Sequence, residues 1–248
     1  NGTLANADVG DYAITAASGT ANSGYTVTYA NTGTLSISAK PITVSGISAS
    51  NKTYNGNTTA TIDTSTVNQT GIGILAGDTV TISATGLFSD KNVGSSKTVT
   101  LTSSYGGTDA TNYTFTDQAS TTADITAKAI TVSGITASDK VFNDTTSATI
   151  DVTGINKSGI GIVSGDTVNI AATGTFNNKK VGTNKTVNLT STYSGADATN
   201  YTFTDQASTT ADVTKASPSI SGLSNQTKTT SDSSFTVAGT PSISGLSI

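Results

Sequence analysis

Side chains that could carry out chemistry are few in this sequence. The chain contains no Cys and no His, and inspection of its 248 residues finds no Glu and no Arg either. Most hydrolytic triads, zinc sites and redox pairs require His or Cys, and bidentate phosphate binding requires Arg. This inventory argues against an enzyme and indicates no cofactor.

Aspartate is the most regularly placed of the remaining reactive residues, because five of them recur 88 residues later. A calcium site takes about six to eight oxygens, usually from carboxylates that lie close together in the sequence. No such Asp-rich loop is present, so hydrogen bonding within turns is the favoured interpretation and calcium at the repeat junctions is the alternative. The pairs are Asp63/Asp151, Asp78/Asp166, Asp109/Asp197, Asp117/Asp205 and Asp124/Asp212.

Asparagine in the triplet Asn-X-Ser/Thr is a candidate for glycosylation. The triplet occurs eleven times, a modest excess over chance in a chain in which Ser and Thr make up about a third of the residues. Glycans attached at this triplet lie on exposed surfaces of exported proteins. The candidates within the repeats are Asn51, Asn57, Asn112, Asn143, Asn184, Asn188 and Asn200.

Two further site types are conceivable. Recurring aromatic residues could line a carbohydrate site, but a thin β core needs these rings and no Trp is present. A Lys–Asn isopeptide bond needs a buried acid beside the pair, and no position in the sequence singles one out. The aromatic pairs are Tyr54/Phe142, Phe88/Phe176, Tyr105/Tyr193, Tyr113/Tyr201 and Phe115/Phe203.

All these residues belong to a tandem repeat. A shift of 88 residues aligns 40–127 with 128–215 without a gap, and 58 of the 88 positions are identical. The stretch 109–124 recurs unchanged at 197–212. A gapless match of this length indicates two homologous units.

Alternation of apolar and polar residues predicts strands throughout each repeat. Val80, Ile82 and Ala84 share one face, and Val99 with Leu101 does the same in the next segment. No window shows the periodicity of an amphipathic helix. The sequence therefore predicts an all-β fold of tandem antiparallel β-sandwich or Greek-key domains. The first repeat has predicted strands at 42–47, 60–63, 79–84, 98–102, 112–116 and 122–126, with Gly77, Gly86, Gly94, Gly106 and Gly107 between strands.

Short junctions predict that the repeats are arranged end to end. Alternation continues almost through 122–132, which leaves only Ala127 and Lys128 as a linker. A linker of this length leaves little conformational freedom, so a rod is expected. The expected segments are 1–39, 40–127, 128–215 and 216–248.

Charge and hydropathy limit the partners that can be expected. The net charge is −4 and the pI is about 4.5, which argues against nucleic-acid binding because that requires clustered cations. No run of eighteen apolar residues is present, so no membrane insertion is expected. The chain starts at Asn1 rather than Met, so we expect it to be part of a longer protein.

Three stretches resemble a known repeat family. The stretches 51–62, 89–102 and 109–115 are similar to the repeat named YDG after its Tyr-Asp-Gly turn, found in secreted bacterial proteins of the filamentous-haemagglutinin type. The naming triplet is Tyr54-Asn55-Gly56 in the first repeat and Phe142-Asn143-Asp144 in the second. Asn tolerates the same turn conformations as Asp, but loss of the glycine at Asp144 is the larger departure for the turn geometry.

The flanking segments resemble a companion repeat called MBG, with 1–39 similar to its closing half and 216–248 to its opening half. The resemblance implies a non-enzymatic stalk on a secreted bacterial surface adhesin, which projects an adhesive region or contributes to cell–cell and matrix contacts. Its implied partners are neighbouring repeats and other copies of the chain. One alternative is an extracellular filament subunit completed by strand exchange. Another is a receptor-binding domain, which should contain a loop-rich insertion that 40–215 lacks.

Overall fold

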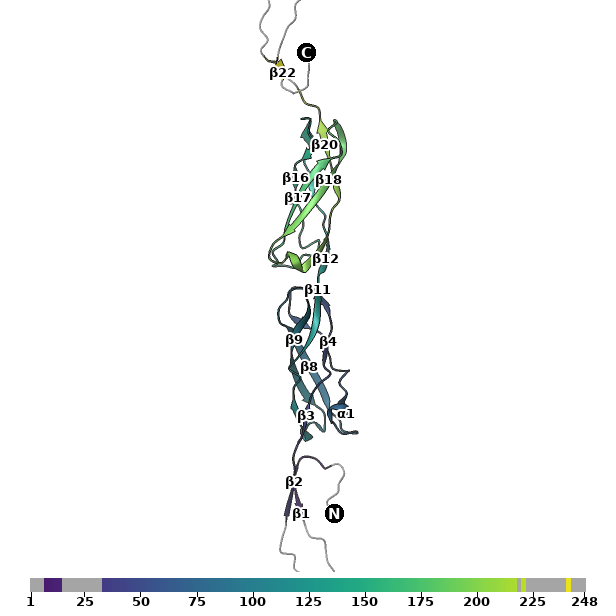
Figure 1. Ribbon diagram of the computed structural model, residues 1–248, viewed down its shortest axis with the longest axis vertical. Coiled ribbons are helices and arrows are strands. Elements are labelled where there is room, and N and C mark those ends of the chain that lie inside the picture. The colour runs from purple at the N-terminus through teal and green to yellow at the C-terminus, as the bar shows by residue number, and fades with distance from the viewer. Residues whose placement is uncertain (1–6, 15–32, 218–219, 222–239, 242–248) are drawn as a thin grey trace, which may run out of the picture. The chain divides into compact units, whose positions relative to one another are not determined.

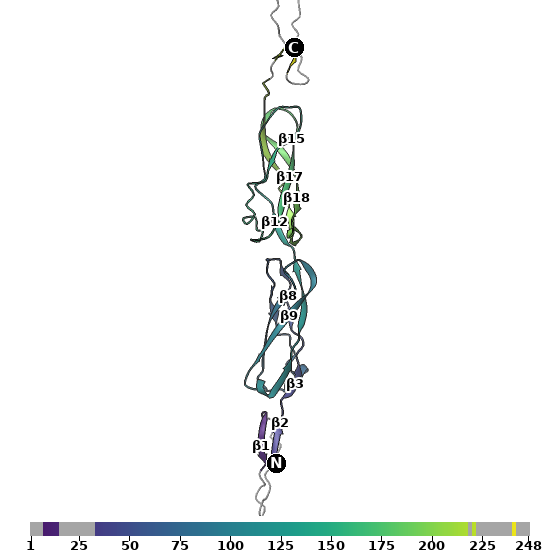
Figure 2. The same ribbon diagram turned by 90° about the vertical axis from the view of Figure 1, so that its left-hand side faces the viewer.

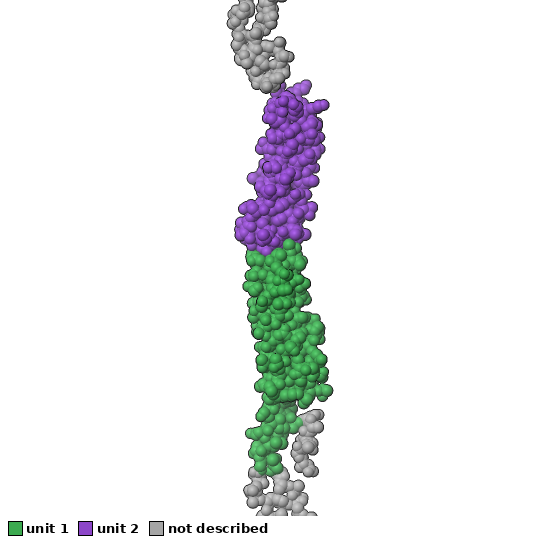
Figure 3. Space-filling view, viewed as in Figure 1, with its two compact units in different colours: residues 1–127 green, residues 128–248 purple. Residues whose placement is uncertain are grey.

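The computed structural model describes residues 7–14, 33–217, 220–221 and 240–241. The chain divides into two compact units, residues 1–127 (unit 1) and 128–248 (unit 2), which are coloured separately in Figure 3. Within the described ranges, no helix is both long enough and apolar enough to cross a lipid bilayer.

Unit 1 is built around a five-stranded sheet of order β5-β11-β9-β8-β6. The long strands β8 and β9 pair antiparallel and lie side by side in Figures 1 and 2. The strands of this sheet are β5 (Lys52–Thr53), β6 (Thr59–Ala60), β8 (Thr81–Phe88), β9 (Gly94–Gly106) and β11 (Ser120–Thr126).

Two short ladders accompany this sheet. β3 (Lys40–Thr43) pairs parallel with β10 (Tyr113–Thr116), and β4 (Ser48–Ala49) pairs antiparallel with β7 (Ile62–Asp63). β4 contacts β11, and β7 contacts β8. The helical elements are α1 (Gln69–Ile72) and the 3₁₀ helix η1 (Ala110–Asn112).

Unit 2 repeats this topology, with a five-stranded sheet of order β14-β20-β18-β17-β15. Its core packs Phe176, Val187, Ala211 and Val213 against partly buried residues that include Ile150. Its elements are β12 (Lys128–Thr131), β13 (Thr136–Ala137), β14 (Lys140–Val141), β15 (Ser147–Ala148), β16 (Ile150–Asp151), β17 (Asn169–Phe176), β18 (Gly182–Ser194), η2 (Ala198–Asn200), β19 (Tyr201–Thr204) and β20 (Ser208–Thr214).

Among the described residues, two antiparallel strand pairs lie outside the repeats. In unit 1, β1 (Gly10–Ile14) pairs with β2 (Gly33–Ile37). In unit 2, β21 (Ile220–Ser221) pairs with β22 (Thr240–Pro241). Most of the segments 1–39 and 216–248, for which MBG-like halves are expected, lies outside the described residues.

The all-β prediction is confirmed, and the predicted inward residues are buried except for Ala84, which is partly buried. Val99 is 0% exposed, while Ile82 and Leu101 are 7% exposed, because apolar side chains at alternate positions share one face of a strand. The strands are not all antiparallel, since β5 pairs parallel with β11, as β3 does with β10.

Gly86, predicted to lie between strands, instead lies within β8. Its inward position is filled by neighbouring side chains: a Cβ there would lie 2.5 Å from Ile62 Cδ1 and 2.8 Å from Val99 Cγ1. Glycine therefore serves close packing at this position, not a turn.

The turn at Asp144 keeps the geometry of its counterpart despite the missing glycine. Gly56 has φ +81° and Asp144 has φ +63°, both in the left-handed region. Asp is among the residues that enter this region most readily. The Asp144 carboxylate also pairs with the Lys179 ammonium at 2.6 Å.

A β-bulge interrupts the pairing of β9 with β11, where the register shifts between Ala123 and Ile125. Ser96 on the bulged side has φ +48°, and its N–H donates to Asp124 Oδ1 at 2.7 Å. Unit 2 has the same arrangement, with Asn184 at φ +49° and its N–H bonded to Asp212. The recurring aspartate thus closes a bulge in each unit.

Candidate functional site

One end of unit 1 gathers several of the sequence-predicted site residues. The buried Tyr113 hydroxyl donates to Asp78 Oδ2 at 2.5 Å and accepts the Leu75 N–H at 3.0 Å. Asp109 Oδ2 accepts the Thr79 N–H at 2.7 Å. Burial, and then the bond to Asp78, raise the pKa of Tyr113. These bonds hold the loop before β8 on the end of the sheet.

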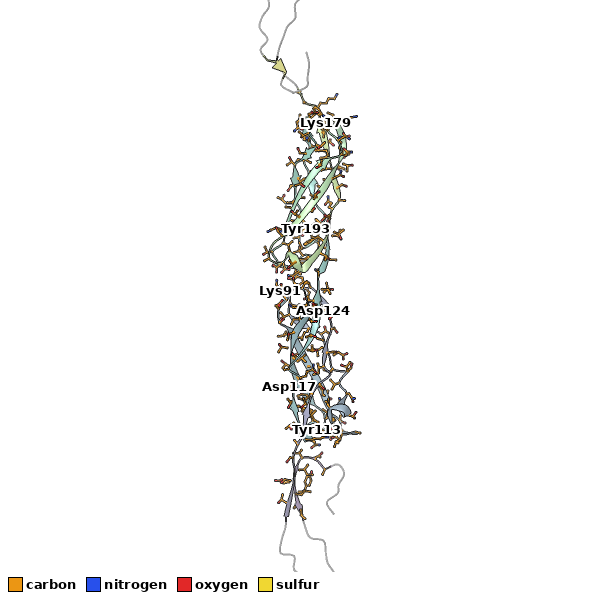
Figure 4. The ribbon with its side chains drawn as sticks, viewed as in Figure 1. Lys91, Tyr113, Asp117, Asp124, Lys179 and Tyr193 are labelled. Carbon is orange, nitrogen blue, oxygen red and sulfur yellow. The ribbon has the colours of Figure 1, made fainter. Side chains whose placement is uncertain are left out.

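The labelled side chains of unit 1 lie toward its two ends. Figure 4 shows Tyr113 and Asp117 toward the end just described, and Lys91 and Asp124 toward the other. Asp117 and Asp124 therefore lie toward opposite ends of the unit and do not belong to one acidic cluster. This distribution agrees with separate structural roles.

Asn112, the last residue of η1, joins this end to the segment before β1. Its Oδ1 accepts the Val9 N–H at 2.9 Å, and its Nδ2 donates to Asp8 Oδ1 at 2.8 Å. A hollow of about 420 Å³ lies beside these Asn112 hydrogen bonds. Asp8, Asp78 and Asp109 line part of it. Across the described ranges, no three acidic residues are grouped so that they could hold a metal ion.

Tyr105 and Phe115 form the most regular aromatic contact of unit 1. Their rings stack with centroids 3.9 Å apart, and the Tyr105 hydroxyl donates to Asp117 Oδ1 at 2.5 Å. Burial, followed by this bond, raises the pKa of Tyr105 to about 12. Unit 2 repeats the stack and the bond with Tyr193 and its partners.

The aromatic pairs are part of the fold rather than of an open surface. Tyr54 is 1% exposed and Phe88 is 3% exposed. Tyr105, Phe115 and Phe142 are partly buried. This placement supports the core interpretation of the rings.

Lys52 holds the turn between β5 and β6, a role that the sequence did not reveal. Its ammonium donates to Asn57 O at 2.7 Å, to Asn57 Oδ1 at 3.0 Å and to Thr59 O at 3.1 Å. It also lies 5.3 Å from the centre of the Phe88 ring, and burial lowers its pKa. Lys140 makes the equivalent bonds in unit 2. The one indication of this role in the sequence is that a lysine occupies the equivalent position of both repeats, at 52 and 140.

The last recurring aspartate pair closes local turns. Asp63 Oδ1 accepts the Ser65 hydroxyl at 2.7 Å and the Ser65 N–H at 2.8 Å, and these bonds lower the pKa of Asp63. Asp151 accepts from Thr153 in the same way. Together with the bonds above, every recurring aspartate of unit 1 accepts a hydrogen bond within its own unit. Only Asp63 does so within a local turn, as the turn interpretation predicts, whereas those earlier bonds join the other four to partners 12 to 35 residues away.

Lysine and asparagine do meet, but on the surface. Lys185 Nζ lies 2.5 Å from Asn178 Oδ1, and the same positions in unit 1 form the Lys97–Asp90 ion pair at 2.7 Å. Asn178 is exposed, as is Asn57 beside Lys52. An isopeptide bond requires a buried acid beside the pair, and these contacts lie on exposed asparagines, so they are ordinary hydrogen bonds.

The candidate glycosylation residues differ in accessibility. Asn200 is 1% exposed, Asn112 is engaged by Asp8 and Val9, and the Asn51 carboxamide bonds to the backbone and side chain of Asp124. Glycosylation stays a prediction, and the exposed candidates are Asn51, Asn57, Asn143, Asn184 and Asn188.

Comparison with known protein families matches both repeats. The family described as YDG domain matches residues 38–123 and again residues 126–211. No curated protein and no solved structure matches the chain. The two matches cover more than half of the chain, which therefore belongs to the YDG domain family.

Proposed function

We propose that this chain is a non-enzymatic spacer segment of a large secreted bacterial surface adhesin. The observation that carries the proposal is that each unit contains two hydrogen bonds between a tyrosine hydroxyl and an aspartate that join separate segments of the fold. Tyr113 bonds to Asp78 and Tyr105 to Asp117, and the same bonds recur in unit 2. Residues used in this way resist deformation of the fold, which suits a mechanical role.

Membership of the YDG domain family supports the cellular setting. Repeats of this kind resemble those of long secreted proteins of the filamentous-haemagglutinin type, with MBG-like segments expected at 1–39 and 216–248. In that setting the segment lies at the bacterial cell surface. It holds an adhesive region away from the cell or contributes to contacts with other cells and with a biofilm matrix.

Solution X-ray scattering tests the spacer role, because a spacer must be extended. A compact chain of this length has a radius of gyration of ~18 Å. Two repeats with flanking segments laid end to end span on the order of 100 Å, and such a rod has a radius of gyration of ~29 Å. We expect the larger value for the intact chain, and a smaller one when Ala127 and Lys128 are replaced by a long Gly/Ser linker. A value of about 20 Å for the intact chain would remove the spacer proposal.

A filament subunit is the second candidate, and the exposed apolar face of β1–β2 favours it. Tyr12 is paired with Leu35, and these residues are 37% and 42% exposed, while Ile14 is 54% exposed. A two-stranded sheet with such a face is expected to bind further strands, including those of another copy. Light scattering over a wide concentration range should then show association that Leu35→Lys abolishes. A monomer at every concentration would eliminate this candidate.

A further inference from the structure

The turns that follow β5 and β14 share an asparagine with the same side-chain hydrogen bond but differ at the residue that follows it. Asn55 Oδ1 accepts the Asn57 N–H at 3.3 Å, and Asn143 Oδ1 accepts the Thr145 N–H at 3.3 Å. Both asparagines are exposed. The residue after the asparagine is Gly56 in unit 1 and Asp144 in unit 2.

We propose that Asn55 is a site of spontaneous deamidation. The backbone nitrogen of Gly56 attacks Cγ of Asn55, a new N–Cγ bond forms, the bond to the side-chain nitrogen breaks, and ammonia leaves. Water then opens the resulting succinimide ring at either carbonyl. The products are aspartate and isoaspartate at position 55, and each carries one additional negative charge at neutral pH.

The geometry of the turn favours this attack. Because Oδ1 of Asn55 bonds to the N–H two residues on, this bond closes a ring of atoms that includes both Cγ of Asn55 and the nitrogen of Gly56. Gly56 has no Cβ to shield that nitrogen, and glycine has the backbone freedom that ring closure needs. Asn55 is exposed to the water that completes the reaction.

Unit 2 contains the matched unreactive site. Asn143 holds the same side-chain bond, but Asp144 places a Cβ and a carboxylate beside the nucleophilic nitrogen. The side chain obstructs the attack, and its negative charge disfavours loss of the N–H proton. Asp144 is also held in place by the ion pair with Lys179.

The expected product makes the two turns alike in charge. Unit 2 already carries a carboxylate in this turn, at Asp144, paired with Lys179. Lys91 occupies the position of Lys179 in unit 1, with its ammonium 5.9 Å from the centre of the Tyr54 ring. A carboxylate at position 55 adds a negative charge one residue before the position of Asp144, and in the aspartate product the triplet reads Tyr-Asp-Gly. The turn of unit 1 thus acquires, as the protein ages, a negative charge like the one that the turn of unit 2 has from Asp144.

Peptide mapping by mass spectrometry tests the proposal on the full chain. The folded protein is aged at mildly alkaline pH and physiological temperature, and the same chain in denaturant provides the reference. We expect aspartate and isoaspartate to accumulate at position 55 of the folded chain while Asn143 stays intact. Conversion in denaturant without conversion in the folded chain would overturn the proposal, as would equal conversion at both positions.

A reciprocal exchange isolates the cause. Gly56→Asp is expected to abolish modification at Asn55, and Asp144→Gly is expected to create it at Asn143. Both positions already adopt positive φ with either residue type, so the exchange suits both turns. Circular dichroism checks that each variant is folded. If Asp144→Gly leaves a folded chain with Asn143 unmodified, the proposed role of the turn is wrong.

Discussion

The side-chain amide of Gln118 pairs with the backbone of Ile47 as a neighbouring strand would. Its Oε1 accepts the Ile47 N–H at 2.9 Å, and its Nε2 donates to the Ile47 carbonyl at 2.8 Å. Gln206 holds Ile135 in the same way in unit 2. Ile47 is 2% exposed, so water has little access to replace these bonds.

We therefore expect Gln118→Leu to destabilise unit 1. Each buried backbone group left without a partner costs about 1–3 kcal/mol. Denaturant unfolding followed by Tyr fluorescence measures the change, with unit 2 as the reference within the same chain. Thr114→Leu on the exposed face of β10 is the control and should have little effect. Equal midpoints for both variants and the wild type would contradict this assignment.

Charge at neighbouring positions of β9 tests the phase of the strand. Val99 is 0% exposed, so Val99→Asp buries an unpaired carboxylate at a cost of several kcal/mol and should unfold unit 1. Thr100 is exposed, and Thr100→Asp should cost no more than about 1 kcal/mol. Circular dichroism melts of the two variants compare them directly. The same loss of stability in both would show that the strand phase is wrong.

Adding a methyl group at position 86 tests the packing of β8 against Ile62. Gly86→Ala should destabilise unit 1 by about 1–3 kcal/mol because the new Cβ has no room. Shortening the obstructing side chain in Gly86→Ala/Ile62→Val should recover part of this loss. Gly106→Ala is the control, since nothing lies within 4 Å of its Cβ position. Calorimetry of the four chains gives the comparison, and full tolerance of Gly86→Ala would refute the steric argument.

Asparagine at position 96 should stabilise unit 1. Ser96 adopts φ +48° at the bulge, and the equivalent residue in unit 2 is Asn184 at φ +49°. Asparagine occupies this region more readily than serine, so Ser96→Asn is expected to raise the unfolding midpoint of unit 1 and Asn184→Ser to lower that of unit 2. Thermal unfolding of the two variants beside the wild type measures both shifts. Shifts of the opposite sign in both units would contradict the prediction.

Alkaline pH should destabilise both units through two partly buried tyrosines, one in each unit. Folding raises the pKa of Tyr105 and of Tyr193 from the ordinary 10.0 to about 12. The unfolded chain thus loses these protons first, and stability that is complete below pH 10 declines as the pH approaches 12. Unfolding midpoints across this interval measure the decline, and Tyr105→Phe should reduce it in unit 1. A slope that Tyr105→Phe leaves unchanged would exclude this cause.

Local pattern was enough to predict the repeat, the all-β class and the buried faces. Val99 and Leu101 could be assigned inward because alternation along a strand depends only on neighbouring residues. The turn role of Asp63 could be predicted for the same reason, since its partner Ser65 is two residues away. These features follow from short stretches of chain.

Contacts between distant residues were decided by the tertiary structure. Gln118 and Ile47 are 71 residues apart, and no periodicity in either stretch indicates that they meet. The parallel pairing of β3 with β10 and the placement of Gly86 inside β8 likewise depend on which strands become neighbours. Alternation specifies the face that a strand buries but not its partner. The partner is selected by the packing of the whole unit, in which Ile62 fills the space that glycine leaves at position 86.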